Sequence, residues 1–318
     1  MSATGPWRVW IDRQPPPEVD VPAGIELTGD LAEADGVVVG ADRYWDAEAC
    51  RRLPRLKVVA RAGIGYDNVE VAECAAAGVA ACNAPDAPTV STAEHALALL
   101  LAVSKRIKVS ERRLADGLGD YRAGHRALEL QGRTLGLLGC GRIGSRVGRY
   151  TAALGMRVLV HDPYLDHVRV AEVGEPVDLA GLWRRSDAIS LHAPATEATR
   201  HIVDAGAIAA MRPGVIIVNC ARGSLIDHEA LLAGLEEGRI AGAGLDVTDP
   251  EPLPAGHPLL GRDDVIVTPH IASSTTAGMV RLLDQALGQA ALWLRGGSPE
   301  HLLDPAAADP AVDRRGPR

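Results

Sequence analysis

The chain has 318 residues, of which 47% are hydrophobic and 23% are charged. This length and composition are typical of a globular enzyme with one large or two medium domains, and they exclude collagen-like and wholly disordered classes. The 33 basic and 41 acidic side chains give a net charge of −8, which argues against nucleic acid or anionic membranes as partners. The longest apolar run, residues 96–103, is much shorter than the roughly 18 to 20 residues of a membrane span.

The first ten residues contain no basic segment followed by an apolar stretch, so a cytoplasmic location is expected.

The cysteines are odd in number and never form a C-x-x-C pair, which disfavours a disulfide framework and a zinc ribbon. We expect them to be reduced, mostly buried and not part of a metal site. They are Cys50, Cys74, Cys82, Cys140 and Cys220.

Short β-branched runs recur along the chain with helical patterns between them, which is typical of parallel sheets built from βαβ units. Several runs are apolar at nearly every position, as expected for strands that helices cover on both faces. Two separate parallel sheets are the simplest interpretation. The predicted strands are residues 8–11, 36–39, 57–60 and 79–82 in the first sheet, and residues 134–138, 157–161, 188–191, 215–219, 242–247 and 265–268 in the second.

Three further segments complete the predicted organisation. Residues 91–114 have the long periodic apolar pattern of one extended helix, and a polar arm over 115–131 follows it. Residues 275–294 form a second long amphipathic pattern, which we expect to return the chain to the first unit. The tail over 305–318 is rich in proline, alanine and charge and is expected to be disordered.

A glycine loop follows the predicted strand 134–138 and opens a helical stretch. It has the G-x-G-x-x-G spacing of Gly139, Gly141 and Gly144, in the strand-to-helix context that a dinucleotide site requires. Asp162 stands 18 residues after Gly144, at the end of the next strand, where a carboxylate can accept hydrogen bonds from ribose hydroxyls and repel a 2′-phosphate. The pattern predicts a nicotinamide dinucleotide site that prefers NAD. The alternative is a turn-forming glycine cluster with a helix-capping aspartate.

Polar residues follow three later strands, where ligands bind in open α/β sheets. Arg222 offers a forked cationic donor for a carboxylate, and His270 can deliver or accept a proton. Glu251, if it lies beside that histidine, would orient its ring and favour the imidazolium. Together they could reduce a 2-keto acid with a hydride from NADH. The alternatives are that Arg222 is a surface residue, that Glu251 is a solvated loop charge and that His270 caps the following helix.

His95, on the first long helix, is interpreted as a packed, hydrogen-bonded core residue.

At these residues the chain resembles the D-isomer-specific 2-hydroxyacid dehydrogenase family, over residues 57–279. The likeness is closest to phosphoglycerate-dehydrogenase-like members, without a regulatory domain. The matching segments are Arg-Ala-Gly-Ile-Gly-Tyr-Asp-Asn at 61–68, Asn-Ala-Pro at 83–85, Ala-Glu-His at 93–95, the glycine loop at 138–144, His-Ala-Pro at 192–194, Asn-Cys-Ala-Arg-Gly at 219–223, Leu-Asp-Val at 245–247, Pro-Glu-Pro at 250–252 and Thr-Pro-His-Ile at 268–271.

The resemblance implies an α/β fold in which a central Rossmann-type dinucleotide-binding domain is inserted into a discontinuous flavodoxin-like substrate domain. On this view residues 1–99 and 285–304 form the substrate domain, and residues 100–284 bind NAD. The helix over 91–114 and the arm over 115–131 are too apolar and too long to serve only as a linker, so we expect a homodimer built on them.

The resemblance assigns roles to individual residues. Arg222 would bind the substrate carboxylate and carbonyl, His270 would donate the proton and Glu251 would be its partner. The backbone amides of Ile64 and Gly65 would hold the substrate carboxylate. Besides the three glycines of the loop, the residues implied to line the cofactor are Arg142, Ile143, Asp162, Pro194, Cys220, Ala221 and Asp246.

Two functions therefore stay open at the level of sequence. The first is an NAD-dependent 2-keto acid reductase, or the corresponding D-2-hydroxyacid dehydrogenase. The second is a non-catalytic protein of the same fold that senses NAD(H) and recruits partners, as corepressors of this fold do. The sequence does not name the substrate.

Overall fold

The computed structural model describes residues 5–117, 122 and 124–304, and these form two compact units. The first unit contains positions 5–89 and 273–304, and the second contains 90–272. The expected disordered tail at 305–318 lies outside the described residues, as does part of the expected arm. Among the helices of the described ranges, none combines the length and apolarity that crossing a membrane requires.

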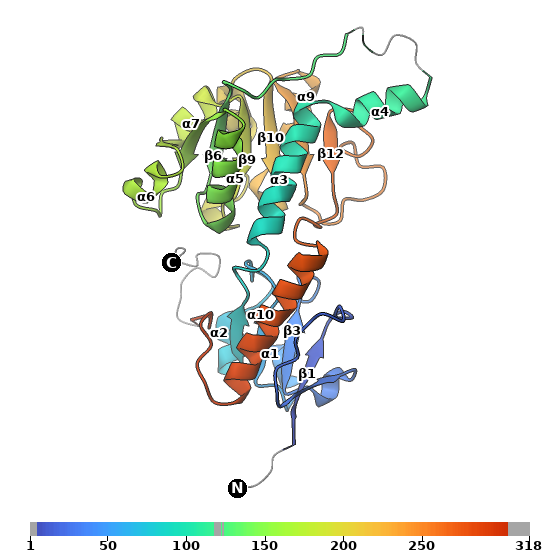
Figure 1. The fold of residues 1–318 in the computed structure, drawn as a ribbon, viewed down its shortest axis with the longest axis vertical. Helices are drawn as coiled ribbons and strands as arrows, with labels where there is room; N and C mark the ends of the chain where they lie inside the picture. Colours follow the sequence, from blue (N-terminus) through green and yellow to red (C-terminus); the bar gives the residue numbers. More distant parts are fainter. Residues whose placement is uncertain (1–4, 118–121, 123, 305–318) are drawn as a thin grey trace. The chain divides into compact units, whose positions relative to one another are not determined.

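The first unit is built on a five-stranded parallel sheet with the strand order β2-β1-β3-β4-β5 (Figure 1). Helix α10 packs on β3, β4 and β5. The buried residues of α1 and α2 belong to a separate apolar cluster with Val37, Val39 and Val59. The elements are β1 (Trp7–Ile11), β2 (Ile25–Thr28), η1 (Leu31–Glu33), β3 (Gly36–Val39), α1 (Ala47–Arg51), β4 (Val58–Arg61), α2 (Val71–Ala76), β5 (Ala80–Asn83) and α10 (Thr276–Leu294).

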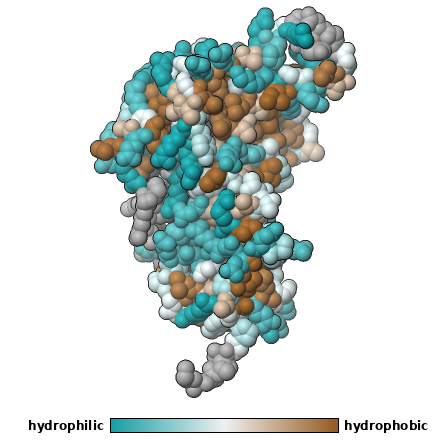
Figure 2. Space-filling view, in the orientation of Figure 1, coloured by the Kyte–Doolittle hydropathy of each residue, from teal (hydrophilic) through white to brown (hydrophobic). Residues whose placement is uncertain are grey.

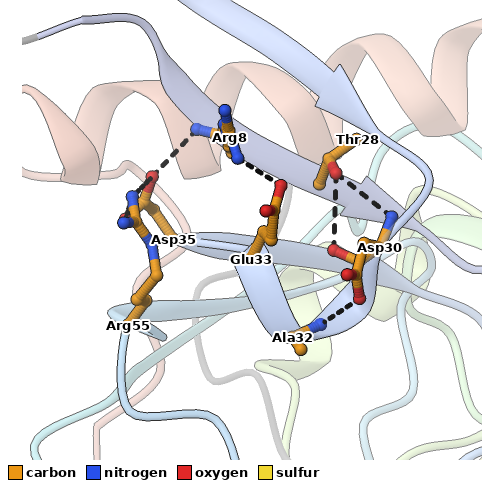
Figure 3. A network of polar contacts seen from close by, with 7 residues as sticks. All are labelled: Arg8, Thr28, Asp30, Ala32, Glu33, Asp35 and Arg55. Carbon is orange, nitrogen blue, oxygen red and sulfur yellow. Dashed lines mark hydrogen bonds and ion pairs between the residues drawn. The ribbon is translucent and has the colours of Figure 1, made fainter.

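Asp35, just before β3, joins strand β1 to the segment that precedes β4 (Figure 3). Its buried carboxylate accepts hydrogen bonds from the Arg8 amide at 3.0 Å and from the Arg55 guanidinium at 2.9 Å. Asp30 caps η1 by accepting from the Ala32 amide, and Glu33 pairs with the Arg8 side chain. These bonds satisfy backbone groups where β2 ends and β3 begins.

The second unit is built on a seven-stranded parallel sheet with the order β12-β11-β10-β9-β6-β7-β8, and apolar clusters lie on both of its faces. Two parallel sheets and an α/β fold were predicted, and both are confirmed. The elements are α3 (Thr89–Ser104), α4 (Ile107–Ala115), β6 (Thr134–Leu138), α5 (Arg142–Ala153), β7 (Arg157–His161), α6 (His167–Ala171), β8 (Glu175–Pro176), α7 (Leu179–Arg185), β9 (Ala188–Leu191), η2 (Glu197–Thr199), α8 (Ala205–Ala210), β10 (Val215–Asn219), η3 (Gly223–Leu225), α9 (His228–Glu236), β11 (Ile240–Leu245) and β12 (Val265–Val267).

The register of this second sheet aligns the last residues of six neighbouring strands. Leu138 pairs with both His161 and Leu191, and Asn219 pairs with both Leu191 and Leu245. Leu245 in turn pairs with Val267. Because all these strands are parallel, the residues that follow them lie along one edge of the sheet.

The prediction of one helix over residues 91–114 is wrong. The structure has two helices, α3 and α4, separated at Arg106, whose φ of 55° is left-handed. A helix cannot continue through a residue in that conformation. Beyond the break, the Lys108 ammonium donates to the carbonyls of Arg262 and Val265, which holds α4 against the loop before β12. These partners are distant in sequence, so the apolar pattern of the helix does not reveal the break.

The units divide after Thr89 and after Ala272, earlier than the expected boundaries after residues 99 and 284. The reason is that α3 packs along its length in the core of one unit, and α10 packs along its length in the core of the other. In α3, Ala93 and Leu100 are both in the core of the second unit. In α10, Leu283 and Leu294 are both in the core of the first unit. The chain therefore passes between the units at the first residue of α3 and again shortly before α10 begins.

Candidate active site

His270 and Glu251 form a hydrogen-bonded pair in the second unit. The distance from His270 Nδ1 to Glu251 Oε1 is 2.6 Å, and the two side chains are 32% and 38% exposed. The other carboxylate oxygen of Glu251 accepts a long bond of 3.4 Å from the Thr248 amide. Since an ionised carboxylate can only accept, His270 Nδ1 carries the hydrogen and Nε2 is the nitrogen left to exchange a proton.

The backbone of His270 is left-handed, with a φ of 53°. This conformation is rare for residues with a side chain and costs about 1 to 2 kcal/mol. Hydrogen bonds to Asp246 hold it in place. The carbonyl of Asp246 accepts from the His270 amide at 2.7 Å, and its carboxylate accepts from the amides of Ile271 and Ala272 at 2.9 and 2.8 Å.

Asp246 is 1% exposed. Burial acts to raise the pKa of this carboxyl, but hydrogen bonds from His95, Thr268 and two backbone amides outweigh it and hold the pKa below its ordinary value. The prediction that Asp246 lines the cofactor stays a prediction. In the structure both of its carboxylate oxygens accept bonds from the segment that carries His270.

Arg222 lies in the turn after β10, next to the strand that leads to Asp246. The turn is fixed by Asn219, whose side-chain amide donates to the Arg222 carbonyl at 2.8 Å and whose oxygen accepts from the Ala221 amide at 3.0 Å. A Cβ on Gly223 would come within 2.0 Å of the Thr248 backbone. The turn that carries Arg222 is therefore packed directly against the start of the loop that carries Glu251.

The glycine loop has the close contacts that a dinucleotide fingerprint requires. Gly139 has a φ of +92°, and a Cβ there would lie 2.7 Å from the His192 backbone. A Cβ on Gly144 would lie 2.2 Å from the Gly139 carbonyl oxygen. A Cβ on Gly141 would meet nothing within 4 Å, and this residue caps α5 without a side-chain hydrogen bond. Space beside Gly141 therefore lies at the amino end of α5, the kind of position at which a helix can receive an anion.

Asp162 joins the glycine loop to the end of β7. One carboxylate oxygen accepts from the Cys140 amide at 2.8 Å, and the other accepts from the amides of Tyr164 and Leu165 at 3.0 and 3.2 Å. A carboxylate has about four acceptor positions, so it can still receive a further donor. The structure therefore places Asp162 beside the glycine loop, as its strand position predicts.

Comparisons with known proteins agree with this geometry. Residues 97–272 match the family model described as D-isomer specific 2-hydroxyacid dehydrogenase, NAD binding domain. The D-3-phosphoglycerate dehydrogenase of Mycobacterium tuberculosis is 42% identical over 83% of this chain and 50% of its own length. The glyoxylate reductase of Korarchaeum cryptofilum is 36% identical over 93% of this chain and 89% of its own length. The crystal structure of the TT0316 protein from Thermus thermophilus has a TM-score of 0.85 at 35% identity, over 93% and 100% of the two chains.

The chain belongs to the D-isomer-specific 2-hydroxyacid dehydrogenase family. The resemblance seen in the sequence is confirmed. The chain spans about half the length of the D-3-phosphoglycerate dehydrogenases that it matches.

The cofactor of this 2-hydroxyacid dehydrogenase domain is NAD. The residues present fit it, because the amino end of α5 can receive a pyrophosphate and Asp162 stands where ribose hydroxyls would come. Arg142 and Ile143 form the first turn of α5. The remaining predicted cofactor residues follow β9 and β10 at the same edge of the sheet, and they are Pro194, Cys220 and Ala221.

The thiols at this edge are suited to packing rather than to nucleophilic attack. Burial, followed by the charge of Asp162, raises the pKa of Cys140 to about 11. Burial also raises the pKa of Cys220. Both thiols stay protonated at neutral pH, so neither is a thiolate nucleophile.

Burial lowers the pKa of His192 to about 4, which leaves that imidazole neutral beside the glycine loop. Within the described ranges, no group of three or more His, Cys, Asp or Glu could hold a metal ion.

Ile64 and Gly65 belong to the first unit, in the turn after β4. The Asn83 side-chain amide donates to the Ile64 carbonyl at 2.8 Å, which fixes this turn to the end of β5. Gly63 has a φ of +152°, and the Arg61 guanidinium occupies the space that a Cβ there would need. The turn therefore has a defined backbone, as a carboxylate-binding loop needs.

His95 takes part in the site in a way that the sequence did not predict. Its interpretation as a hydrogen-bonded residue is confirmed, since Nε2 lies 3.0 Å from Thr268 Oγ1. It also lies 3.4 Å from Asp246 Oδ1, within the network that holds the His270 segment. No short-range pattern reveals this contact, because Thr268 is 173 positions away along the chain.

Two glycine substitutions separate packing from cofactor binding. We expect Gly144→Ala to lower both thermal stability, by about 1 to 3 kcal/mol, and NADH affinity, because its Cβ would overlap the Gly139 carbonyl. Gly141→Ala should leave stability within about 1 kcal/mol, since its Cβ meets only open space, yet weaken NADH binding. Thermal unfolding and NADH fluorescence titration measure the two effects. Equal loss of stability in both variants would contradict this account of the loop.

Proposed function

We propose that this 2-hydroxyacid dehydrogenase interconverts a small 2-keto acid and the D-2-hydroxy acid, with NADH as the preferred reductant. The observation that carries the proposal is the pair formed by His270 Nδ1 and Glu251 Oε1 at 2.6 Å. The pair lies at the same edge of the NAD-binding sheet as the glycine loop, and the Arg222 turn packs against the Glu251 loop.

Each of the three residues has a role that its chemistry supports. Arg222 binds the substrate carboxylate and polarises the keto group with its forked guanidinium. His270 gives the proton at Nε2 to the keto oxygen, and takes it back in the reverse direction. Glu251 accepts the Nδ1–H hydrogen bond, which fixes the tautomer and the ring orientation. When bound, the nicotinamide supplies the hydride.

The substrate carboxylate has a second proposed partner in the first unit. The backbone amides of Ile64 and Gly65, in the turn after β4, are donors for it. The relatives reported above are named as a dehydrogenase and a reductase, which does not favour the alternative of a non-catalytic NAD(H) sensor.

The acid–base role of His270 is tested by turnover. NADH oxidation is followed with glyoxylate, hydroxypyruvate, pyruvate and 3-phosphohydroxypyruvate, and the best of them is used for variants. His270→Ala should lower kcat by roughly 10² to 10⁴, while NADH still binds. His167→Ala is the matched control, since His167 is exposed on α6 of the same unit. Near-wild-type turnover of His270→Ala on the best substrate would refute the acid–base role of His270. No turnover of any of the four 2-keto acids by the unsubstituted protein, with NADH still bound, would favour the sensor.

Cofactor preference is tested at Asp162. Its carboxylate would repel the 2′-phosphate of NADPH, so kcat/KM should be higher with NADH. Asp162→Asn removes the charge and keeps an oxygen that can accept from the Cys140 amide. This variant should relax the preference without abolishing turnover. Equal kcat/KM for NADH and NADPH in the unsubstituted protein would show that the assignment of Asp162 is mistaken.

A homodimer built on α3, α4 and the arm is also proposed. Ile107 and Leu114, seven residues apart on α4, are 55% and 60% exposed and share one helix face. Figure 2 shows hydrophobic side chains over α3, and a mixture of hydrophobic and hydrophilic side chains over α4, on the visible face. Sedimentation should give a dimer that Leu114→Glu weakens, whereas Val168→Glu, at a 70% exposed position on α6, leaves it intact. A stable and active monomer of the unsubstituted protein would contradict the proposal.

A further inference from the structure

His95 stands at the end of a hydrogen-bonded chain that leads to the segment of His270. From α3, its Nε2 atom lies 3.0 Å from Thr268 Oγ1 and 3.4 Å from Asp246 Oδ1. The Thr268 hydroxyl donates to the same Asp246 oxygen at 2.6 Å. All three residues belong to the second unit.

The positions of the hydrogens in this chain follow from what each group can donate. The ionised carboxylate of Asp246 has no hydrogen to give, so the bond of 2.6 Å uses the single hydroxyl hydrogen of Thr268. The Thr268 oxygen can then only accept from His95. The Nε2 atom of His95 must therefore carry a hydrogen, and its ring donates toward both Thr268 and Asp246.

Loss of this donor would act directly on the backbone around His270. Thr268 is two residues before His270, and Asp246 accepts from the amides of Ile271 and Ala272 just after it. Asp246 is 1% exposed, so water cannot easily replace a missing donor. A less constrained Asp246 and Thr268 would allow His270 to leave its left-handed conformation, with φ at 53°, and to move away from Glu251.

We propose that His95 is a positioning residue for the reaction, which donates from Nε2 to Thr268 and Asp246 and thereby holds His270 at the angle needed for proton transfer. The inference rests on the proposed function, because it assumes that His270 is the acid–base group. His95 itself touches neither substrate nor cofactor in this role. This role needs a hydrogen-bond donor at the position of His95 Nε2, and it does not need a positive charge on the ring.

The first experiment compares two substitutions of His95. His95→Leu removes the donor and should lower kcat about tenfold to a hundredfold, the size expected when a hydrogen bond to a charged group is lost. Because Asp246 is also a predicted cofactor residue, kcat is measured at saturating NADH. His95→Gln can place an amide N–H near the position of Nε2 and should restore most of kcat. His167→Leu, at the exposed histidine of α6, is the matched control and should behave as the unsubstituted protein.

The second experiment is a double-mutant cycle with His270→Gln. If His95 acts through His270, His95→Leu should have almost no further effect on kcat once His270 is replaced. Thr268→Val removes the hydroxyl that joins His95 to Asp246 and should lower kcat in the same way. This variant provides the test if His95→Leu does not fold, as judged by thermal unfolding.

The outcomes are distinguishable. Additive losses in the cycle, or no recovery of kcat in His95→Gln, would show that His95 does not act through His270 as a donor. Unchanged kcat in His95→Leu, beside a His270→Gln variant that has lost activity, would overturn only the role of His95. Near-wild-type turnover of His270→Gln would instead contradict the proposed function itself.

Discussion

The in-register parallel pairing of the second sheet is the constraint on which the site depends. Along the sheet, in the spatial order β7-β6-β9-β10-β11-β12, each strand ends opposite the end of its neighbour. Leu138 pairs with Leu191, for example, and Leu245 pairs with Val267. A shift by one residue in any strand would turn its side chains to the other face and displace the loop that follows it. The glycine loop, the Arg222 turn and the His270 segment thus share one edge because the strands beneath them share one register.

Two loops at that edge are stabilised by opposite physical means. The glycine loop depends on missing side chains, since a Cβ on Gly139 or Gly144 would overlap backbone atoms. The His270 segment depends on a buried charge, because the Asp246 carboxylate collects donors from Thr268 and two amides. Burial of an ionised carboxylate is costly unless its oxygens are fully bonded. Asp246 can therefore be buried only because several groups donate hydrogen bonds to its carboxylate. Two of these donors are backbone amides next to His270, so the same bonds order the backbone at His270.

Local sequence patterns could predict much of this structure, but contacts between distant segments could not be predicted. The glycine spacing around Gly141 and the polar residues after three strands are short-range signals, so the position of the site at a sheet edge followed from them. The break at Arg106 did not, because α4 is held by carbonyls of Arg262 and Val265. The contact between His95 and Thr268 was missed for the same reason, since it joins α3 to the segment after β12.

The location of His95 on α3 adds a further consequence. This helix contributes Ala93, Ala96 and Leu100 to the core of the second unit, so its backbone is fixed by apolar packing. A donor on such a helix is held more firmly than a donor on a loop, since many contacts must be lost before it moves. A rigid helix thus supports a loop segment that contains a left-handed histidine. In the proposed role of His95, the apolar packing of α3 would therefore help to hold His270 beside Glu251, through the His95 imidazole and the buried Asp246 carboxylate.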